Sequence, residues 1–339
     1  MLTQLTSPRL LLLLLQLTRA HSGDGWPPAP FDENAPGNWL LTASTDGRPT
    51  LTAPIIATVI LRQKAAGAAH EYGTVVHANH VRYAVTNGYD YATRIQPYHD
   101  DGRDIRWAKV KLLASLLSRG WRWAFWTDAD SLFNCRVRLE DAVATGITTG
   151  IPLAAGSDDG PSLIFSGDRN SMINSGQLLM RNSSWSRDFL SRVWSIYPPS
   201  ANESWHCKRP GEAILPEEDQ NAFQVALWEG LEQRHHTARK SCAETIWQQH
   251  KALTASACAS LLSKLRPSFR AHVRCVPQEL MNSYDSVRAF RVHVPGDQKA
   301  KLERLTALSR ETNCQAAAAA GSSRRGPLEA WLVRRWAGG

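Results

Sequence analysis

Hydrophobic positions along the chain form two kinds of run, and their order indicates an α/β protein. Residues 55–60 are continuously apolar and mostly β-branched, which is typical of a strand buried on both faces of a parallel sheet. Residues 105–117 carry apolar side chains at helical spacing, and Gly120 stands where that helix would end. The short aromatic run over residues 121–126 predicts a second buried strand, which leads directly into Asp128.

Weaker patterns of the same two kinds continue along the rest of the chain. A helix from residue 80 is expected to end in a turn at Asn87-Gly88 before a short strand. Further helices are expected over residues 139–145, 185–195, 217–229 and 243–265, and further strands over residues 173–180 and 290–294. Ser183 or Ser184 is expected to cap the helix that follows them. Strands that alternate with helices predict a mostly parallel sheet flanked by helices.

Composition divides the chain into four parts. Residues 1–20 combine a basic residue, a short apolar run and small residues at its end, which predicts a signal peptide. We favour this over a membrane anchor because a spanning helix needs roughly 20 apolar residues. Residues 21–50 are rich in turn formers and suggest a linker or stem, residues 51–314 form the folded domain, and residues 315–339 form a low-complexity tail.

Charge and cysteine content narrow the choice of partners and of compartment. The net charge of +8 is scattered along the chain, which argues against a nucleic acid partner and suits phosphate-bearing small molecules. A peripheral association with a membrane is left open. After entry into the lumen of the secretory pathway the six cysteines could form disulfides, whose connectivity the sequence leaves open. Asn182 and Asn202 begin glycosylation sequons.

The strongest local candidate for chemistry is the triplet Asp128-Ala129-Asp130. Two carboxylates one residue apart at a strand end can converge on a hard divalent cation that bridges the phosphates of a diphosphate. Ligands of open α/β sheets bind at such strand ends. The same triplet also occurs in ordinary solvated turns, so its weight comes from the aromatic strand before it and from the motifs that follow.

Five short motifs, in the same order, resemble segments of glycosyltransferase family 34, which holds fungal α-galactosyltransferases and plant xyloglucan xylosyltransferases. They are residues 107–109 with 123–133, residues 174–182 with 185–186, residues 218–223, residues 282–284 and residues 293–296. Together they extend over roughly residues 80 to 300. The chain departs from the family pattern at Val294, where the family prefers Phe, and at Asp297, where it usually has Cys.

The resemblance implies the A-type glycosyltransferase fold, a Rossmann-like fold of the nucleotide-diphospho-sugar transferase type, with residues 51–314 as catalytic domain. It implies Mn²⁺ or another divalent cation bound by Asp128, Asp130 and His293, and carboxylates with imidazole suit Mn²⁺. It further implies a nucleotide-sugar donor such as UDP-galactose or UDP-xylose and a glycan or glycoprotein acceptor. The product would be an α-linkage formed with retention in the lumen of the Golgi or ER.

Two neighbouring side chains match the family's catalytic segment. Gln220 matches an amide that lies near the anomeric carbon of the donor sugar, where it would act electrostatically because an amide does not titrate. Asp219 would bind sugar hydroxyls or position Gln220. An acidic residue at this place also has an ordinary explanation, as compensation of the dipole of the helix that starts there.

The other matched residues concern donor and substrate binding. Lys109 is expected to pair with phosphate or with Asp130, and the alternative is an exposed helix lysine. Asn174 and Ser175 would lie where donor and acceptor meet, and Gly176 would let backbone approach closely. The closing motif adds a donor-binding role for Gly296. Lys299 and Lys301, just beyond it, could neutralise the diphosphate, but we expect them to be solvated helix charges.

Two other functions compete with the transferase. A secreted carbohydrate-binding protein could keep the fold and lose turnover, although such a protein has no physical need for the complete set of site residues. A metal-dependent hydrolase would require a further histidine or carboxylate beside Asp130 to act as general base.

Overall fold

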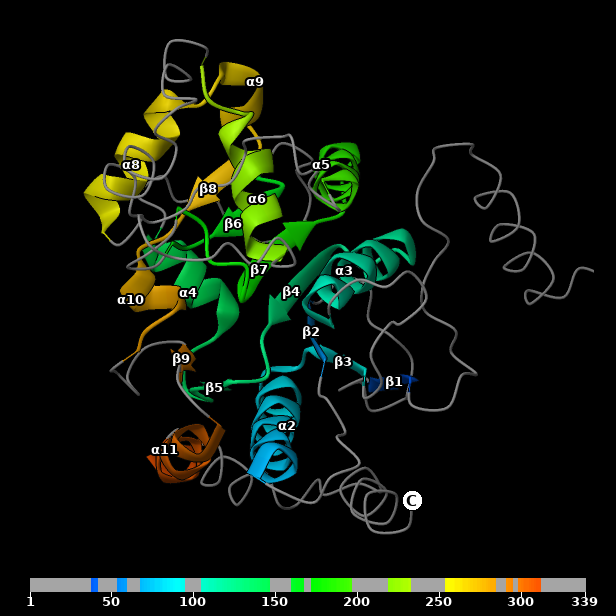
Figure 1. Ribbon diagram of the computed structural model, residues 1–339, viewed down its shortest axis with the longest axis vertical. Coiled ribbons are helices and arrows are strands. Elements are labelled where there is room, and N and C mark those ends of the chain that lie inside the picture. Colours follow the sequence, from blue (N-terminus) through cyan, green and yellow to red (C-terminus); the bar gives the residue numbers. More distant parts are fainter. Residues whose placement is uncertain are drawn as a thin grey trace, which may run out of the picture.

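The computed structural model is an α/β structure built on one large sheet (Figure 1). It describes residues 38–41, 54–59, 68–94, 105–146, 160–167, 172–196, 219–232, 254–284, 291–294 and 298–311. Gly296, Asn202 and the predicted signal peptide and tail lie outside these residues. Within the described residues no helix is both long and apolar enough to cross a membrane.

The large sheet contains seven strands in the order β1-β3-β2-β4-β7-β6-β8. The strands are β1 (Asn38–Leu41), β2 (Ile55–Val59), β3 (Asp90–Arg94), β4 (Trp123–Thr127), β6 (Leu163–Phe165), β7 (Gln177–Arg181) and β8 (Val273–Cys275). The pairings make β2, β3, β4, β6 and β8 run in one direction, while β1 and β7 run against them. The predicted mostly parallel sheet is therefore confirmed.

Helices cover both faces of the sheet. They are α2 (Ala68–Asn87), α3 (Ala108–Ser118) after a 3₁₀ turn at Ile105–Trp107, α4 (Leu139–Gly146), α5 (Ser184–Ser195), α6 (Asp219–Trp228), α8 (Ala255–Lys264), α9 (Pro267–Arg270), α10 (Gln278–Met281) and α11 (Gln298–Glu311). One apolar core joins the sheet to α3, α5, α6 and α8, and a second joins its opposite face to α2, α4 and α10.

Strand β4 shows why its aromatic sequence is needed at the centre of this sheet. Ala124 and Trp126 face the first core, whereas Trp123 and Phe125 face the second, and all four are buried. A strand buried on both faces has no solvent-facing positions, so it reads as a continuous apolar run. The sequence prediction for this strand is confirmed.

Several predicted boundaries hold and others are corrected. Helix α3 ends before Gly120, whose φ of 100° is in the left-handed region, and the side chain of Ser183 caps α5. The strand predicted over residues 173–180 starts only at residue 177, because the residues before it form a loop. Strand β1, which pairs with β3, lies inside the range 21–50 that we expected to be a linker. Of the helix predicted over residues 243–265, the structure describes α8 alone.

A smaller sheet holds the segment that follows the Asp128 triplet. Strand β5 (Ser131–Phe133) pairs antiparallel with β9 (Arg291–His293). On its other side, Asn79 of α2 donates to the Phe133 carbonyl at 3.0 Å and accepts from the Phe133 amide at 2.7 Å. His80 donates to the Ser131 carbonyl at 2.9 Å. The backbone of β5 is thus hydrogen-bonded on both sides, which fixes the end of the loop between β4 and β5.

Asn182, the first residue of a predicted glycosylation sequon, is hydrogen-bonded within the fold. Its Nδ2 atom donates to the Leu117 carbonyl at 2.7 Å, and its Oδ1 atom accepts from Arg187 at 3.0 Å. The half-buried side chain therefore satisfies a carbonyl at the C-terminal end of α3. These bonds give Asn182 a role in the fold, and its glycosylation stays a prediction.

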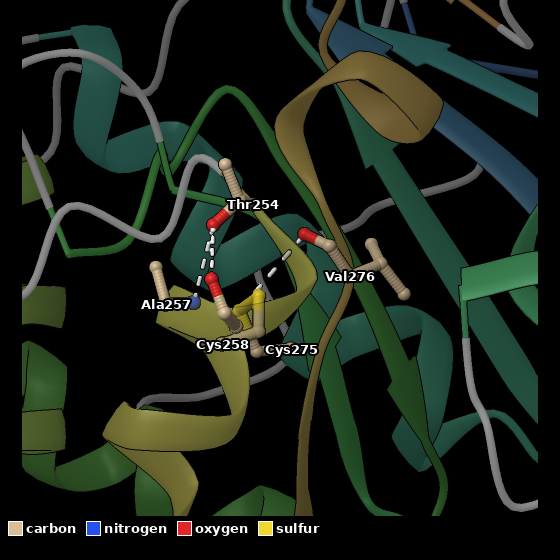
Figure 2. Close-up of a disulfide and its surroundings, with 6 residues drawn as sticks. Thr254, Ala257, Cys258, Cys275 and Val276 are labelled. Atoms are coloured by element: carbon tan, nitrogen blue, oxygen red, sulfur yellow. Dashed lines mark hydrogen bonds between the residues drawn. A yellow bond between two sulfur atoms is a disulfide. The ribbon is translucent and has the colours of Figure 1, made fainter.

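A disulfide ties helix α8 to strand β8 at the edge of the sheet. Cys258 and Cys275 form the bond, and Thr254 caps the start of α8 by accepting from the Ala257 amide at 3.2 Å (Figure 2). Cys135 is also disulfide-bonded. Among the described cysteines none is free.

Replacing Cys258 and Cys275 by Ala should lower the free energy of unfolding by about 3 kcal/mol. The bond closes a segment of sequence separation 17, and a cross-link of this length restricts the unfolded chain by roughly that amount. Urea unfolding followed by tryptophan fluorescence measures the change. Replacing Ser260 and Ser263, two exposed residues of α8, by Ala is the control, and an equal loss there would contradict the assignment to the cross-link.

Candidate functional site

The site forms because strand β7 runs against its neighbour β4. Their antiparallel register pairs Thr127, the last residue of β4, with Gln177, the first residue of β7. The loop before β7 therefore meets the loop after β4, and the Asp128 amide donates to the Gly176 carbonyl at 2.9 Å. Two motifs about fifty residues apart in the sequence are thereby joined at the carboxyl end of the central strand.

Lys109 lies in the first turn of α3, which the chain topology brings to the same edge of the sheet. A helix that connects two parallel strands starts near the carboxyl end of the first and returns to the beginning of the second. The Lys109 side chain is 3% exposed, and its Nζ atom lies 2.8 Å from Asp219 and 3.3 Å from Asp128. It also donates to the carbonyl and the hydroxyl of Ser175, each at 3.1 Å.

The ammonium group of Lys109 stays charged in this setting. Burial opposes the charge, but the carboxylates of Asp128 and Asp219 outweigh it and raise the pKa of Lys109 above its ordinary value. The partners of Lys109 expected from the sequence are phosphate or Asp130. In the structure Lys109 pairs with Asp128 and Asp219, and Asp130 pairs with Lys301. Lys109 is also not an exposed helix lysine.

Asp219 and Gln220 open helix α6 beside this lysine. Asp219 is 2% exposed and forms its ion pair with Lys109. Gln220 accepts a long hydrogen bond of 3.4 Å from the Ser175 amide through Oε1. Both roles expected of Asp219, binding sugar hydroxyls or positioning Gln220, stay predictions.

Gly176 is required by close packing within the site. A Cβ atom at this position would lie 2.8 Å from Oδ2 of Asp128 and 2.8 Å from Oδ1 of Asn174. Asn174 Oδ1 also accepts from the Gly176 amide at 2.7 Å. The close approach expected from the sequence is therefore present, and it is an approach of side-chain oxygens to the glycine.

Asp128 is held in place by atoms of its own strand and loop. The indole nitrogen of Trp126 donates to Asp128 Oδ1 at 2.7 Å, and the Ser131 hydroxyl donates to the Asp128 carbonyl at 2.7 Å. Thr127 and Ser131 share a further hydroxyl hydrogen bond of 2.9 Å. The sequence suggested no individual role for Trp126 or Ser131, although both belong to one of the motifs that carried the resemblance.

Asp130 is held from the C-terminal part of the chain. The amide of Val294 donates to the Asp130 carbonyl at 2.9 Å, and Lys301 of α11 donates to Asp130 Oδ2 at 2.7 Å. The expectation that Lys301 is a solvated helix charge is wrong, since its side chain is 19% exposed and ion-paired. No local sequence signal marks this lysine, because its partner is 171 residues away.

His293 reaches the site by its backbone position. In the β5–β9 pair it lies opposite Ser131, one residue from Asp130. Its side chain is outside the described part of the structure. Among the side chains that are described, no three His, Cys, Asp or Glu gather as a metal site. The ligand set of Asp128, Asp130 and His293 therefore stays a prediction.

The residues present fit a hard divalent cation by their chemistry. Two carboxylates with exposed fractions of 35% and 18% occupy one loop, and the strand that pairs with this loop's end contributes a histidine. Carboxylate oxygen and imidazole nitrogen suit Mn²⁺.

The chain resembles a solved structure at low sequence identity. It is similar to a glycosyltransferase involved in the glycosylation of the major capsid of PBCV-1, with 11% sequence identity, a TM-score of 0.45, and coverage of 75% of this chain and 99% of that chain. No protein-family model matches the chain, and no curated protein matches it either.

Replacing Gly176 by Ala should lower the free energy of unfolding by about 1–3 kcal/mol, because the added methyl group forces the Asp128 and Asn174 oxygens apart. Urea unfolding measures the change. Adding Asn174→Ala removes one of the two contacts, so the double variant should lose less than the two single variants combined. Strict additivity would contradict the proposed crowding.

Replacing Lys109 by Met should destabilise the protein by about 3 kcal/mol or more, because Asp219 is left charged and buried. Asp128 contributes less since it is partly solvated. Asp219→Asn in the same chain should recover part of the loss by removing that charge. Thermal and urea unfolding test both, and a double variant as unstable as Lys109→Met alone would contradict the pairing.

Proposed function

We propose that the protein is a metal-dependent retaining glycosyltransferase. It transfers a sugar, galactose or xylose, from a nucleotide-sugar donor such as UDP-galactose or UDP-xylose to a glycan hydroxyl, forms an α-linkage and releases the nucleoside diphosphate. The resemblance to glycosyltransferase family 34, carried by the five motifs in their order, supports the donor class and the retention of configuration.

The observation that carries this proposal is the convergence of four separate segments at Lys109. Lys109 lies in the first turn of α3. Its side chain contacts the loop after β4 through Asp128, the start of α6 through Asp219 and the loop before β7 through Ser175. A fold alone needs no such assembly of charged and polar groups, with the partly exposed Asp128 among buried partners, at the carboxyl ends of its strands.

In the proposed mechanism Asp128, Asp130 and His293 hold the cation. When bound, the cation neutralises charge that develops on the departing diphosphate. Asn174 and Ser175 line the place where the sugar of the donor meets the acceptor. Gln220 directs its amide dipole at the reacting sugar, and its bond to the Ser175 amide leaves the Nε2 group of the side chain to act there.

In this mechanism Asp219 positions Gln220 and does not itself contact the reacting atoms. Its buried carboxylate is fixed by Lys109, and it stands beside Gln220 at the first turn of α6. The ion pair therefore sets where the amide of Gln220 lies relative to the metal-binding loop. Pre-organised dipoles of this kind avoid the cost of reorienting solvent during the reaction.

The lumen of the Golgi or ER is the proposed compartment. The signal-peptide pattern over residues 1–20 and the disulfide between Cys258 and Cys275 both support it, since such bonds persist in oxidising compartments. The inactive carbohydrate-binding protein remains the alternative function, and it predicts sugar binding without turnover.

A donor screen tests the proposal. Purified protein with Mn²⁺ should release nucleoside diphosphate from one nucleotide-sugar in the presence of a glycan acceptor. Gln220→Ala should lower kcat by about 100-fold or more with donor binding retained, because the loss falls on the transition state. Asp130→Ala should weaken Mn²⁺-dependent donor binding.

Glu279→Ala, an exposed carboxylate on α10, is the matched control and should keep full turnover. Chelation of the metal should abolish transfer, and added Mn²⁺ should restore it. The absence of Mn²⁺-dependent binding with every nucleotide-sugar would refute the proposed function. Sugar binding without turnover would favour the alternative.

A further inference from the structure

Both carboxylates of the Asp128-Ala129-Asp130 motif are paired with a lysine. Asp128 pairs with Lys109 at 3.3 Å, and Asp130 pairs with Lys301 at 2.7 Å. The two lysines come from widely separated parts of the chain, one from α3 and one from α11. Each carboxylate that would bind a cation therefore already has a positively charged partner.

Lys301 is directed at Asp130 by the packing of its helix. Leu305, one turn further along α11, is fully buried against Val76 of α2 and Leu132 of β5. Residues four apart lie on the same face of a helix, so the buried Leu305 turns Lys301 toward the loop before β5. The amide of Val294, on the segment that leads into α11, is bonded to Asp130 as well.

The charges of this cluster disfavour a free cation. Its described ionic side chains are Asp128, Asp130, Asp219, Lys109 and Lys301, which leave a single net negative charge. A divalent cation that arrives alone must displace the ammonium group of Lys301 from Asp130. The displaced positive charge then stays close to the cation and repels it. A cation that arrives on a diphosphate brings negative oxygens with it, and these give the displaced ammonium a new partner.

We propose that Lys301 makes entry of the cation depend on the diphosphate. In the absence of donor its ammonium group is paired with the Asp130 carboxylate and prevents the free metal ion from binding there. When the complex of metal and nucleoside diphosphate binds, the ammonium group leaves Asp130 and the cation takes its place. This inference rests on the proposed function, and it assigns to Lys301 a role in the order of binding that the five motifs do not include.

Titration with Mn²⁺, followed by the electron paramagnetic resonance signal of the free ion, tests this role. Lys301→Met should bind Mn²⁺ alone about tenfold more tightly than the wild type, because the competing ion pair is gone. With saturating UDP the two proteins should differ by about twofold at most. Lys301→Gln, which keeps a polar tip, should show the same gain, and Lys301→Arg should behave as the wild type.

Arg304→Met is the matched control. It removes one positive charge from the same helix, but its guanidinium bonds the Tyr284 carbonyl and not Asp130, so Mn²⁺ affinity should stay at the wild-type value. An unchanged affinity in both Lys301→Met and Lys301→Gln, or an equal gain with and without UDP, would overturn this inference alone. A wild-type protein that binds no Mn²⁺ with either UDP or GDP would overturn the proposed function.

Discussion

The buried ammonium of Lys109 is the group on which the candidate site depends. It contacts two carboxylates and two oxygens of Ser175, and these belong to three segments of the chain: the loop after β4, the start of α6 and the loop before β7. A lysine that is 3% exposed is stable only when its charge is matched, and the buried Asp219 is stable at that depth only because of it. Lys109 and Asp219 thus each depend on the other, because removing one of them leaves the other buried and charged without its partner.

The sheet determines which segments can meet at this lysine. Because β7 reverses direction, the loop that precedes it reaches the same edge as the loop that follows β4. The first turn of α3 reaches that edge by the ordinary connection of parallel strands. Gly176 completes the arrangement, since its missing side chain leaves room for the oxygens of Asp128 and Asn174.

Elements with a local signal were predictable, and those fixed by distant contacts were not. The aromatic run of β4, the helix end before Gly120 and the Ser183 cap follow from neighbouring residues alone. The triplet around Asp128 was found in the same way. The sequence around Lys301 predicts a solvated charge, because only the packing of α11 on α2 brings this lysine to Asp130. The strand at β7 was placed too early, since apolar Ile173 lies in a buried loop that a pattern cannot distinguish from a strand.

The bonds from Val294 and Lys301 to Asp130 join the loop after β4 to a part of the chain that is synthesised late. A ribosome releases the chain from its N-terminus, and α/β domains can begin to fold before synthesis ends. The sheet strands through β8 all precede β9 and α11, so the main sheet can assemble while the loop at Asp130 still lacks its clamp. The nascent protein would acquire its main sheet first and the bonds that fix the loop at Asp130 last, when α11 packs against α2.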